Sequence, residues 1–322
     1  MRAKYLTMFK NRYWREYPLF LQSVLLLLMI FSFTSFFFAI SQLIIPKATG
    51  VAIADLQNIN ETSPKSFIDA ALWLQAITAT GIFLLPALLF AYLTHPRPAS
   101  YLGLRKPGKV VHWILVPIVM VGAVIIFLLI NSLFQKLNWS ADLKDLQEKH
   151  DNTVKAFLNM NSFTDFLKAF AIMAILPAVS EELIFRGILM RLVHKRSHRI
   201  GIAIAVSSLV FAIVHYDPAG LVAIFCAAIL LGGIYYLTGS LWLSIFAHLL
   251  NNGLQIILLY FGSENKAIKT LMEGNELPQA IVIAGVALFA ASFYLLWKNR
   301  TPLPDDWSDD FAGEEREDNF TR

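Results

Sequence analysis

Eight long apolar runs dominate this sequence and restrict what it can fold into. A helix needs about 20 mostly apolar residues to cross the hydrocarbon core of a bilayer, and most of these runs approach or exceed that length. The runs are 19–45, 67–93, 110–134, 166–192, 200–214, 221–237, 241–260 and 281–297, of which the fifth and sixth are short. Every peptide group inside a bilayer must find a partner within the protein, which helices of this length provide. The sequence therefore predicts an all-α polytopic membrane protein, a bundle of about eight transmembrane helices.

The composition excludes an ordinary soluble globular domain. Hydrophobic residues make up 57% of the 322 positions, charged residues make up 16%, and the mean hydropathy is +0.57. Soluble domains typically contain about 25% charged residues. The basic pI comes largely from Lys and Arg in short loops, and no basic stripe alternates with aromatic residues. Nucleic acid is therefore not an expected partner.

Positive charges predict the orientation in the membrane, because Lys and Arg in short loops favour the cytoplasmic side. They gather before the first run, between the second and third, and after the fourth. These residues are Arg2, Lys4, Lys10, Arg12 and Arg15, then Arg97, Arg105, Lys106 and Lys109, then Arg191, Lys195, Arg196 and Arg199. We therefore expect both termini in the cytoplasm, and the loops 46–66, 135–165 and 261–278 outside. If the source is bacterial, we expect the membrane to be the plasma membrane. The first run is too long for a signal-peptide core, so we expect it to stay in the protein as a membrane anchor.

Two adjacent carboxylates, Glu181 and Glu182, stand inside the apolar fourth run. An ionised side chain in the hydrocarbon region is costly and is a functional candidate by default. Residues four apart share a helix face, so Glu182 can pair with Arg186. Glu181 has no such local partner, which makes it the stronger candidate for chemistry.

Two further polar sites lie in the runs that follow. Phe211 and His215 end the fifth run, and His248 and Asn252 share one helix face in the seventh. At a rise of about 1.5 Å per residue from the cytoplasmic boundary, Glu181 lies roughly 15 Å deep and His248 and Asn252 lie roughly 12 and 18 Å deep. His215 lies roughly 24 Å deep on the same count and is the weakest fit. Three helices can thus bring these side chains together.

The three motifs, taken in order, resemble those of a known family. They are Glu-Glu-x-x-x-Arg at Glu181, Glu182 and Arg186, Phe-x-x-x-His at Phe211 and His215, and His-x-x-x-Asn at His248 and Asn252. This pattern is similar to that of the CPBP family of CAAX proteases and bacteriocin-processing enzymes, also called the Abi family, which includes the Ras-converting type of CAAX endopeptidase. The resemblance implies a membrane-embedded protease of the CAAX prenyl protease type, with its catalytic core within 165–260.

Intramembrane peptide hydrolysis also follows from the chemistry of these residues. Hydrolysis needs a nucleophilic water and hydrogen-bond donors for the charge that develops on the carbonyl oxygen. Glu181 is the expected base, because a carboxylate in an apolar setting is a better base than one in water. His215 would hold the same water or relay its proton, and His248 and Asn252 would donate to the oxyanion.

The other motif residues are expected to support this site. Glu182 and Arg186 would neutralise each other and fix the helix, and Phe211 would pack against the catalytic groups. Glu181 and Glu182 point about 100° apart on a helix, so equal roles are not expected.

Zinc-dependent hydrolysis is the alternative mechanism, with Glu181, His215 and His248 as ligands of an ion that carries an activated water. The residue types suit zinc. However, the sequence has no His-Glu-x-x-His helix, and Asn252 suits an oxyanion donor better than a zinc ligand. We therefore expect no cofactor, with divalent zinc as the alternative.

Two alternative functions remain. A transporter would also place polar groups in the membrane, but it would usually show paired inverted repeats, which this sequence lacks. A catalytically inactive membrane scaffold or immunity protein of the same fold is the stronger alternative, because a fold can persist after activity is lost. Such a relative is expected to lack a motif residue, and here all are present.

The chain divides into four parts along its length. Residues 1–164 form an N-terminal three-span region with an outer loop, 165–260 form the CPBP-like catalytic core, and 261–300 contain the last transmembrane helix. Residues 301–322 are acidic and poor in apolar side chains, which predicts a disordered tail. The expected partners are the lipid bilayer and a peptide or protein substrate in the membrane, lipidated substrates included.

Overall fold

The computed structural model describes residues 13–262 and 278–311, and the regular structure within them is helical throughout. Seven helical stretches in these ranges are long and apolar enough to cross a membrane, and an eighth, α11 (Ile200–Ile213), is shorter. With 14 residues, α11 is about 21 Å long, which is less than the hydrocarbon core of a bilayer. The predicted all-α polytopic bundle is confirmed, including its short fifth helix.

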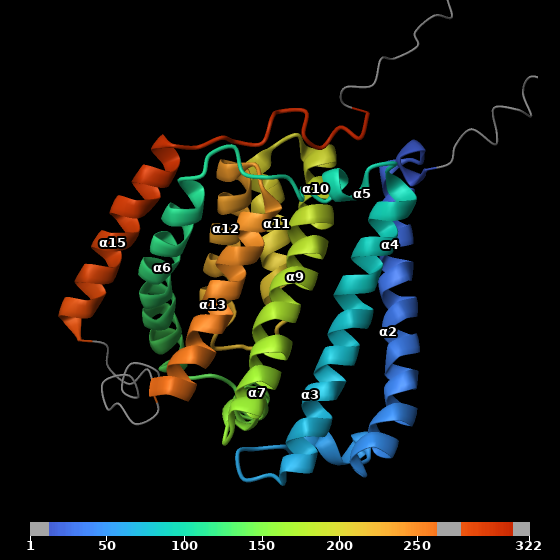
Figure 1. The fold of residues 1–322 in the computed structure, drawn as a ribbon, viewed down its shortest axis with the longest axis vertical. Helices are drawn as coiled ribbons and strands as arrows, with labels where there is room; N and C mark the ends of the chain where they lie inside the picture. The colour runs from blue at the N-terminus through green and yellow to red at the C-terminus, as the bar shows by residue number, and fades with distance from the viewer. Residues whose placement is uncertain (1–12, 263–277, 312–322) are drawn as a thin grey trace, which may run out of the picture.

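Counted together with α11, the helical stretches run up and down the bundle in turn, so that neighbours along the chain are antiparallel (Figure 1). The second stretch joins α3 (Lys65–Ala79) to α4 (Leu85–Thr94) through a π-helical turn. The fourth, Phe163–Ser197, joins α8 (Phe163–Ala169), α9 (Leu176–Glu182) and α10 (Met190–Ser197) through two π-helical segments. The other long helices are α2 (Leu19–Thr49), α6 (His112–Gln135), α12 (Leu221–Thr238), α13 (Leu241–Gly262) and α15 (Gln279–Lys298).

The helices that carry the sequence motifs, α9, α11 and α13, lie together with α12 in the middle of the bundle (Figure 1). α2, α3 and α4 lie on one side, and α6 and α15 on the other. α6 and α15 approach closely because each contributes a glycine: a Cβ on Gly122 would lie 2.6 Å from the backbone nitrogen of Phe289, and one on Gly285 would lie 2.8 Å from Ile125 Cβ.

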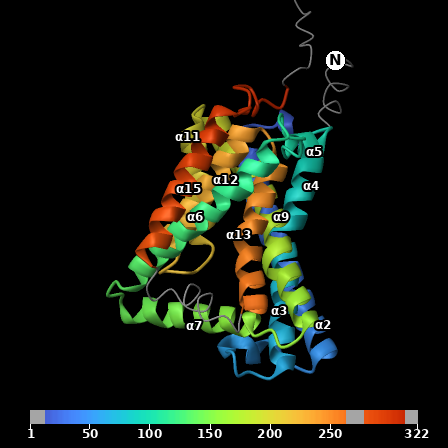
Figure 2. The ribbon, with the colours of Figure 1, turned by 60° about the vertical axis from the view of Figure 1, so that its left-hand side comes forward.

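The basic segments that are predicted to face the cytoplasm lie, as far as the structure describes them, at one end of the bundle (Figure 1). This end holds α5 (Pro98–Tyr101) with its flanking arginines, the link between α10 and α11, and the segment 299–311. α7 (Ala141–Leu158) lies at the opposite end, across the direction of the long helices (Figure 2). Which end faces the cytoplasm stays a prediction. Residues 1–12, 263–277 and 312–322, with most of the predicted outer loop 261–278, lie outside the described residues.

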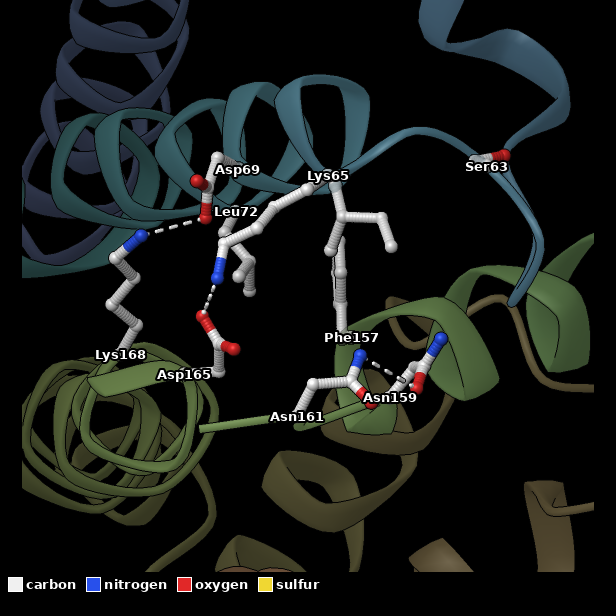
Figure 3. Close-up of a pocket in the computed structure, with 10 residues that line it drawn as sticks. Ser63, Lys65, Asp69, Leu72, Phe157, Asn159, Asn161, Asp165 and Lys168 are labelled. Atoms are coloured by element: carbon white, nitrogen blue, oxygen red, sulfur yellow. Dashed lines mark hydrogen bonds and ion pairs between the residues drawn. The ribbon is translucent and has the colours of Figure 1, made fainter. Parts of the chain in front are cut away.

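A small cavity lies near the C-terminal end of α7, where ion pairs connect neighbouring helices (Figure 3). Two ion pairs cross it: Lys65 Nζ lies 2.5 Å from Asp165 Oδ1, and Lys168 Nζ lies 2.8 Å from Asp69 Oδ1. Phe157, near the C-terminal end of α7, forms part of the same lining. The ion pairs join the start of α3 to α8, so the charged groups of this cavity are used in holding helices together.

The prediction of a disordered tail does not hold for residues 301–311. Trp307 and Asp310 are only 7% and 6% exposed. The Asp310 carboxylate pairs with Arg191, at 3.2 Å, and with Lys195, both on α10. Acidic composition did not reveal these partners, because they come from a helix more than a hundred residues earlier. The remaining predicted tail, 312–322, lies outside the described residues.

Candidate active site

The side chains of Glu181 and Glu182 project from α9 in different directions and lie in different surroundings. The two residues end α9, and a π-helical segment, Leu183–Leu189, follows at once. Such wide turns inside α-helices are frequent at functional sites. The Glu182 side chain is 0% exposed, whereas that of Glu181 is 12% exposed. Unequal roles for the two acids, expected from their helical angle, agree with this difference.

Glu182 is the centre of a buried hydrogen-bond network. Its Oε1 lies 2.7 Å from Arg186 Nη1 and 3.0 Å from His248 Nδ1. Its Oε2 accepts a hydrogen bond of 2.6 Å from the Ser244 hydroxyl. The predicted pair between Glu182 and Arg186 is therefore present, and both carboxylate oxygens are satisfied. Burial of a charge requires this kind of compensation.

Arg186 is held by two further groups of the neighbouring helices. Its Nη2 donates to the backbone carbonyl of Ala228 on α12 at 2.8 Å, and its guanidinium lies 4.6 Å from the centre of the Phe211 ring. The Phe211 ring also lies 4.5 Å from the His215 ring. Arg186, in the π-helical segment that follows α9, thus contacts both α12 and α11. The supporting role of Arg186 and Phe211 stays a prediction.

Both histidines of the motifs direct the same nitrogen toward Glu181. In His248, Nδ1 faces the Glu182 carboxylate, which can only accept, so Nδ1 carries a proton. In His215, Nδ1 lies 2.7 Å from the Phe211 carbonyl oxygen and donates to it for the same reason. The Nε2 atoms of His215 and His248 each lie 3.9 Å from Glu181 Oε2. α9, α13 and the turn after α11 thus bring these atoms close to one another.

The distances from Glu181 Oε2 to the two ring nitrogens fit an intervening water. At 3.9 Å neither histidine bonds Glu181 directly, but a water can bridge Glu181 Oε2 to either ring nitrogen. Glu181 Oε2 is buried and has no hydrogen-bond partner in the described part of the chain. A buried carboxylate oxygen with two ring nitrogens opposite can orient a water and remove its proton.

The same atoms fit a preformed zinc site less well. Ligand atoms about 2.0 to 2.1 Å from a tetrahedral zinc lie about 3.3 Å from one another, closer than the 3.9 Å between Glu181 and each ring nitrogen. Among the described residues, no group of three or more His, Cys, Asp and Glu side chains has the geometry of a metal site. The arrangement matches a water-sized gap better than a metal-sized one.

Asn252 lies one turn beyond His248, as predicted, but its hydrogen bonds are with other groups. Its Nδ2 donates to the Met173 carbonyl oxygen at 3.3 Å, and its Oδ1 accepts from Asn251. Met173 belongs to the π-helical segment Phe170–Ile175, where a widened turn changes the carbonyl pairing. One amide hydrogen of Asn252 is therefore engaged, and its role as an oxyanion donor stays a prediction that uses the second hydrogen.

Ser244 is a site residue that the sequence analysis missed. Its hydroxyl donates to Glu182 Oε2 at 2.6 Å, and it also lies 3.0 Å from the Leu231 carbonyl oxygen. Ser244 precedes His248 by four residues, so both lie on one face of α13. That spacing could have identified Ser244 from the sequence, because a residue one turn from a motif histidine faces the same neighbouring helix.

The central part of the chain matches a family model. Residues 163–254 match the model described as type II CAAX prenyl endopeptidase Rce1-like. Residues 163–254 form an Rce1-like domain. Comparison with curated proteins and with solved structures found no match. The Rce1-like domain contains all the motif residues from Glu181 to Asn252, and the suspected relationship to CAAX proteases is confirmed.

Proposed function

We propose that this chain is an intramembrane endopeptidase that hydrolyses a peptide bond of a membrane-associated or lipidated protein or peptide. The observation that carries the proposal is the convergence of Glu181 Oε2 with the Nε2 atoms of His215 and His248, at 3.9 Å from each, inside an apolar bundle. The Rce1-like domain supports the same reaction class. In this proposal both termini lie in the cytoplasm, and a bacterial chain resides in the plasma membrane.

In the first step, Glu181 removes a proton from the bridging water, and the oxygen of that water attacks the substrate carbonyl carbon. His215 orients that water through Nε2. Because Glu181 Oε2 accepts no hydrogen bond from the described residues, this oxygen is available for the proton. Glu181 then returns the proton to the leaving amine as the peptide bond breaks, so that acid and base roles belong to one carboxyl group.

The negative charge of the tetrahedral intermediate is stabilised by donors on α13. His248 donates from Nε2 when the ring carries two protons, and the Glu182 carboxylate 3.0 Å from Nδ1 offsets the positive charge of that form. Asn252, one turn away, donates its second amide hydrogen. Donors placed in advance in an apolar site are worth more than donors in water, because they need no reorganisation during the reaction.

Cleavage of peptides by the purified protein tests the proposed activity. The chain is reconstituted in lipid vesicles and incubated with a peptide library that includes prenylated members, and products are mapped by mass spectrometry. We expect cleavage at internal peptide bonds. Absence of any product across the library, from protein that melts cooperatively, would contradict the proposal and favour an inactive protein of the same fold.

Replacing Asn252 with alanine should lower kcat roughly a hundredfold and leave KM nearly unchanged. An interaction made mainly in the transition state gives this pattern, whereas substrate binding would change KM. Asn251→Ala is the comparison: its Nδ2 donates to Asn252 Oδ1 at 3.0 Å, so its loss affects only the orientation of the Asn252 amide and should lower kcat much less. An equal loss in both variants, or a rise in KM alone, would contradict the oxyanion role.

Strong chelators should leave the turnover of the reconstituted protein unchanged. The reason is that the proposed nucleophile is a water activated by Glu181, without a metal ion. The measurement is kcat before and after dialysis against a chelator, with metal analysis of the same samples and a zinc peptidase as the positive control. Loss of turnover in step with one bound zinc per chain, restored by added zinc, would establish the alternative with Glu181, His215 and His248 as ligands.

A further inference from the structure

The loop that carries His215 connects two apolar helices, and its backbone needs hydrogen-bond partners. Residues 214–220 connect α11 to α12, and Tyr216 adopts a positive φ of 52°. In membrane surroundings an unpaired backbone amide is costly, so irregular segments persist only where other parts of the protein satisfy them. The nitrogen of Gly220 donates to the Asp217 side chain at 2.8 Å. The nitrogen of Ala219 is satisfied from elsewhere in the chain.

The partner of Ala219 is the side chain of Gln147 on α7. Gln147 Oε1 accepts a hydrogen bond of 2.8 Å from the Ala219 nitrogen, across 72 positions of the sequence. The Nε2 of Gln147 donates to Asp151 Oδ1 at 2.9 Å, one turn further along α7. This second bond fixes which way the amide points, since Asp151 accepts and the Ala219 N–H donates. Both ends of the Gln147 amide are thus used.

α7 is itself fastened to the bundle. Asn159, which follows α7, donates to the Glu61 carbonyl oxygen at 2.7 Å, and Phe157 is 8% exposed beside the ion pairs of Figure 3. From there α7 lies across the end of the bundle (Figure 2). A side chain on a helix anchored in this way can hold a loop in place.

Charge couples α7 to the same loop. Burial disfavours the charged form of His150 on α7, but the neighbouring Asp151 and Asp217 carboxylates outweigh it and raise the pKa of His150 above its ordinary value. Asp217 belongs to the His215 loop. The loop and α7 therefore meet through an electrostatic contact as well as through a hydrogen bond.

We propose that Gln147 is a positioning residue for the reaction: its bond to the Ala219 nitrogen holds the loop so that His215 Nε2 faces Glu181. The inference rests on the proposed peptidase function. Gln147 precedes the Rce1-like domain, residues 163–254, so it adds to the site a contact from outside the matched segment. Gln147 touches neither Glu181 nor the bridging water, and it acts only through the loop.

The test compares three variants in lipid vesicles. Gln147→Met removes the acceptor and keeps the length of the side chain. Glu148→Met, at an exposed neighbouring position of α7, is the matched control. The paired change Gln147→Glu with Asp151→Asn keeps an acceptor oxygen opposite Ala219, a donor opposite position 147, and the total charge, so it should restore function.

We expect Gln147→Met to lower kcat about tenfold or more with KM and melting temperature nearly unchanged, because a small displacement of His215 misaligns the water. The same variant should speed hydrogen exchange in the peptide that covers 214–220. Glu148→Met should change neither quantity, and the paired variant should return both toward wild type.

Unchanged exchange in Gln147→Met would contradict the bond that the inference requires, even in an active enzyme. Faster exchange with unchanged kcat would contradict the positioning role. Absence of cleavage by the wild-type chain would instead contradict the proposed function, while the exchange measurement would still decide whether Gln147 holds the loop.

Discussion

Glu181→Gln should lower the turnover number about a thousandfold, because the amide keeps the shape of the side chain but cannot accept the proton of the water. The loss should appear in kcat, with KM changed little, since Glu181 is expected to act on the water and the tetrahedral intermediate. The measurement is steady-state cleavage of a peptide identified with the wild-type chain, in vesicles of the same lipid composition.

The melting temperature of Glu181→Gln provides the control for this result. Glu181 Oε2 has no hydrogen-bond partner among the described residues, so the substitution removes no bond that stabilises the bundle. The variant should therefore melt like the wild-type protein. Near-normal turnover in a folded Glu181→Gln protein would remove Glu181 from its role as base.

Glu182→Gln should destabilise the protein by about 3 kcal/mol or more, because it leaves the Arg186 guanidinium buried without its counter-charge. Arg186→Gln should have a similar effect for the converse reason, and the two side chains are 0% and 1% exposed. In a protein of this size such a loss lowers the apparent melting temperature by about 5 °C or more. Activity should fall as well, because Glu182 also holds His248 at 3.0 Å.

A surface ion pair of the same spacing gives the matched control. Lys149 and Asp145 on α7 are four residues apart and 2.8 Å from each other, but both side chains are more than half exposed. Water screens such pairs, so Lys149→Gln should shift the melting temperature by no more than about 1 °C. If Glu182→Gln and Arg186→Gln melted like Lys149→Gln, the buried pair would be absent and the division of roles between the two acids would be wrong.

Local spacing allowed the sequence to predict part of the site correctly. The pair between Glu182 and Arg186 follows from four residues on one helix face, and the structure contains it. The shared face of His248 and Asn252 is likewise a property of one helix. Contacts between different helices could not be predicted from local spacing. The bond from His248 to Glu182 and the bond from Ser244 to Glu182 depend on how α13 packs against α9.

His215 shows why depth counted along the sequence has limited accuracy. The count placed His215 roughly 9 Å deeper than Glu181, on the assumption of straight helices that start at one boundary. In the structure the chain leaves α11 at Ile213, and a loop brings His215 Nε2 to 3.9 Å from Glu181 Oε2. Helix tilt, π-helical turns and the shape of a loop are set by packing, and no local pattern in the sequence reports them.

The C-terminal segment illustrates a second limit. Its acidic composition predicted disorder, because acidic residues without apolar neighbours seldom fold alone. Asp310 instead finds Arg191 and Lys195, and Trp307 packs against Tyr235 with ring centres 5.9 Å apart. Partners distant in the sequence decide whether such a segment is ordered.

Isotope labelling tests the central claim, that a water activated by Glu181 attacks the peptide bond directly. The reconstituted protein performs a single turnover on a cleavable peptide in water enriched in oxygen-18, and both the products and the peptide that contains Glu181 are weighed by mass spectrometry. Direct attack by water places one heavy oxygen in the newly formed carboxyl group and none in Glu181, and this is the expected result. Heavy oxygen in the Glu181 carboxylate, or none in the product, would show that Glu181 itself attacks the substrate and would contradict the proposed mechanism.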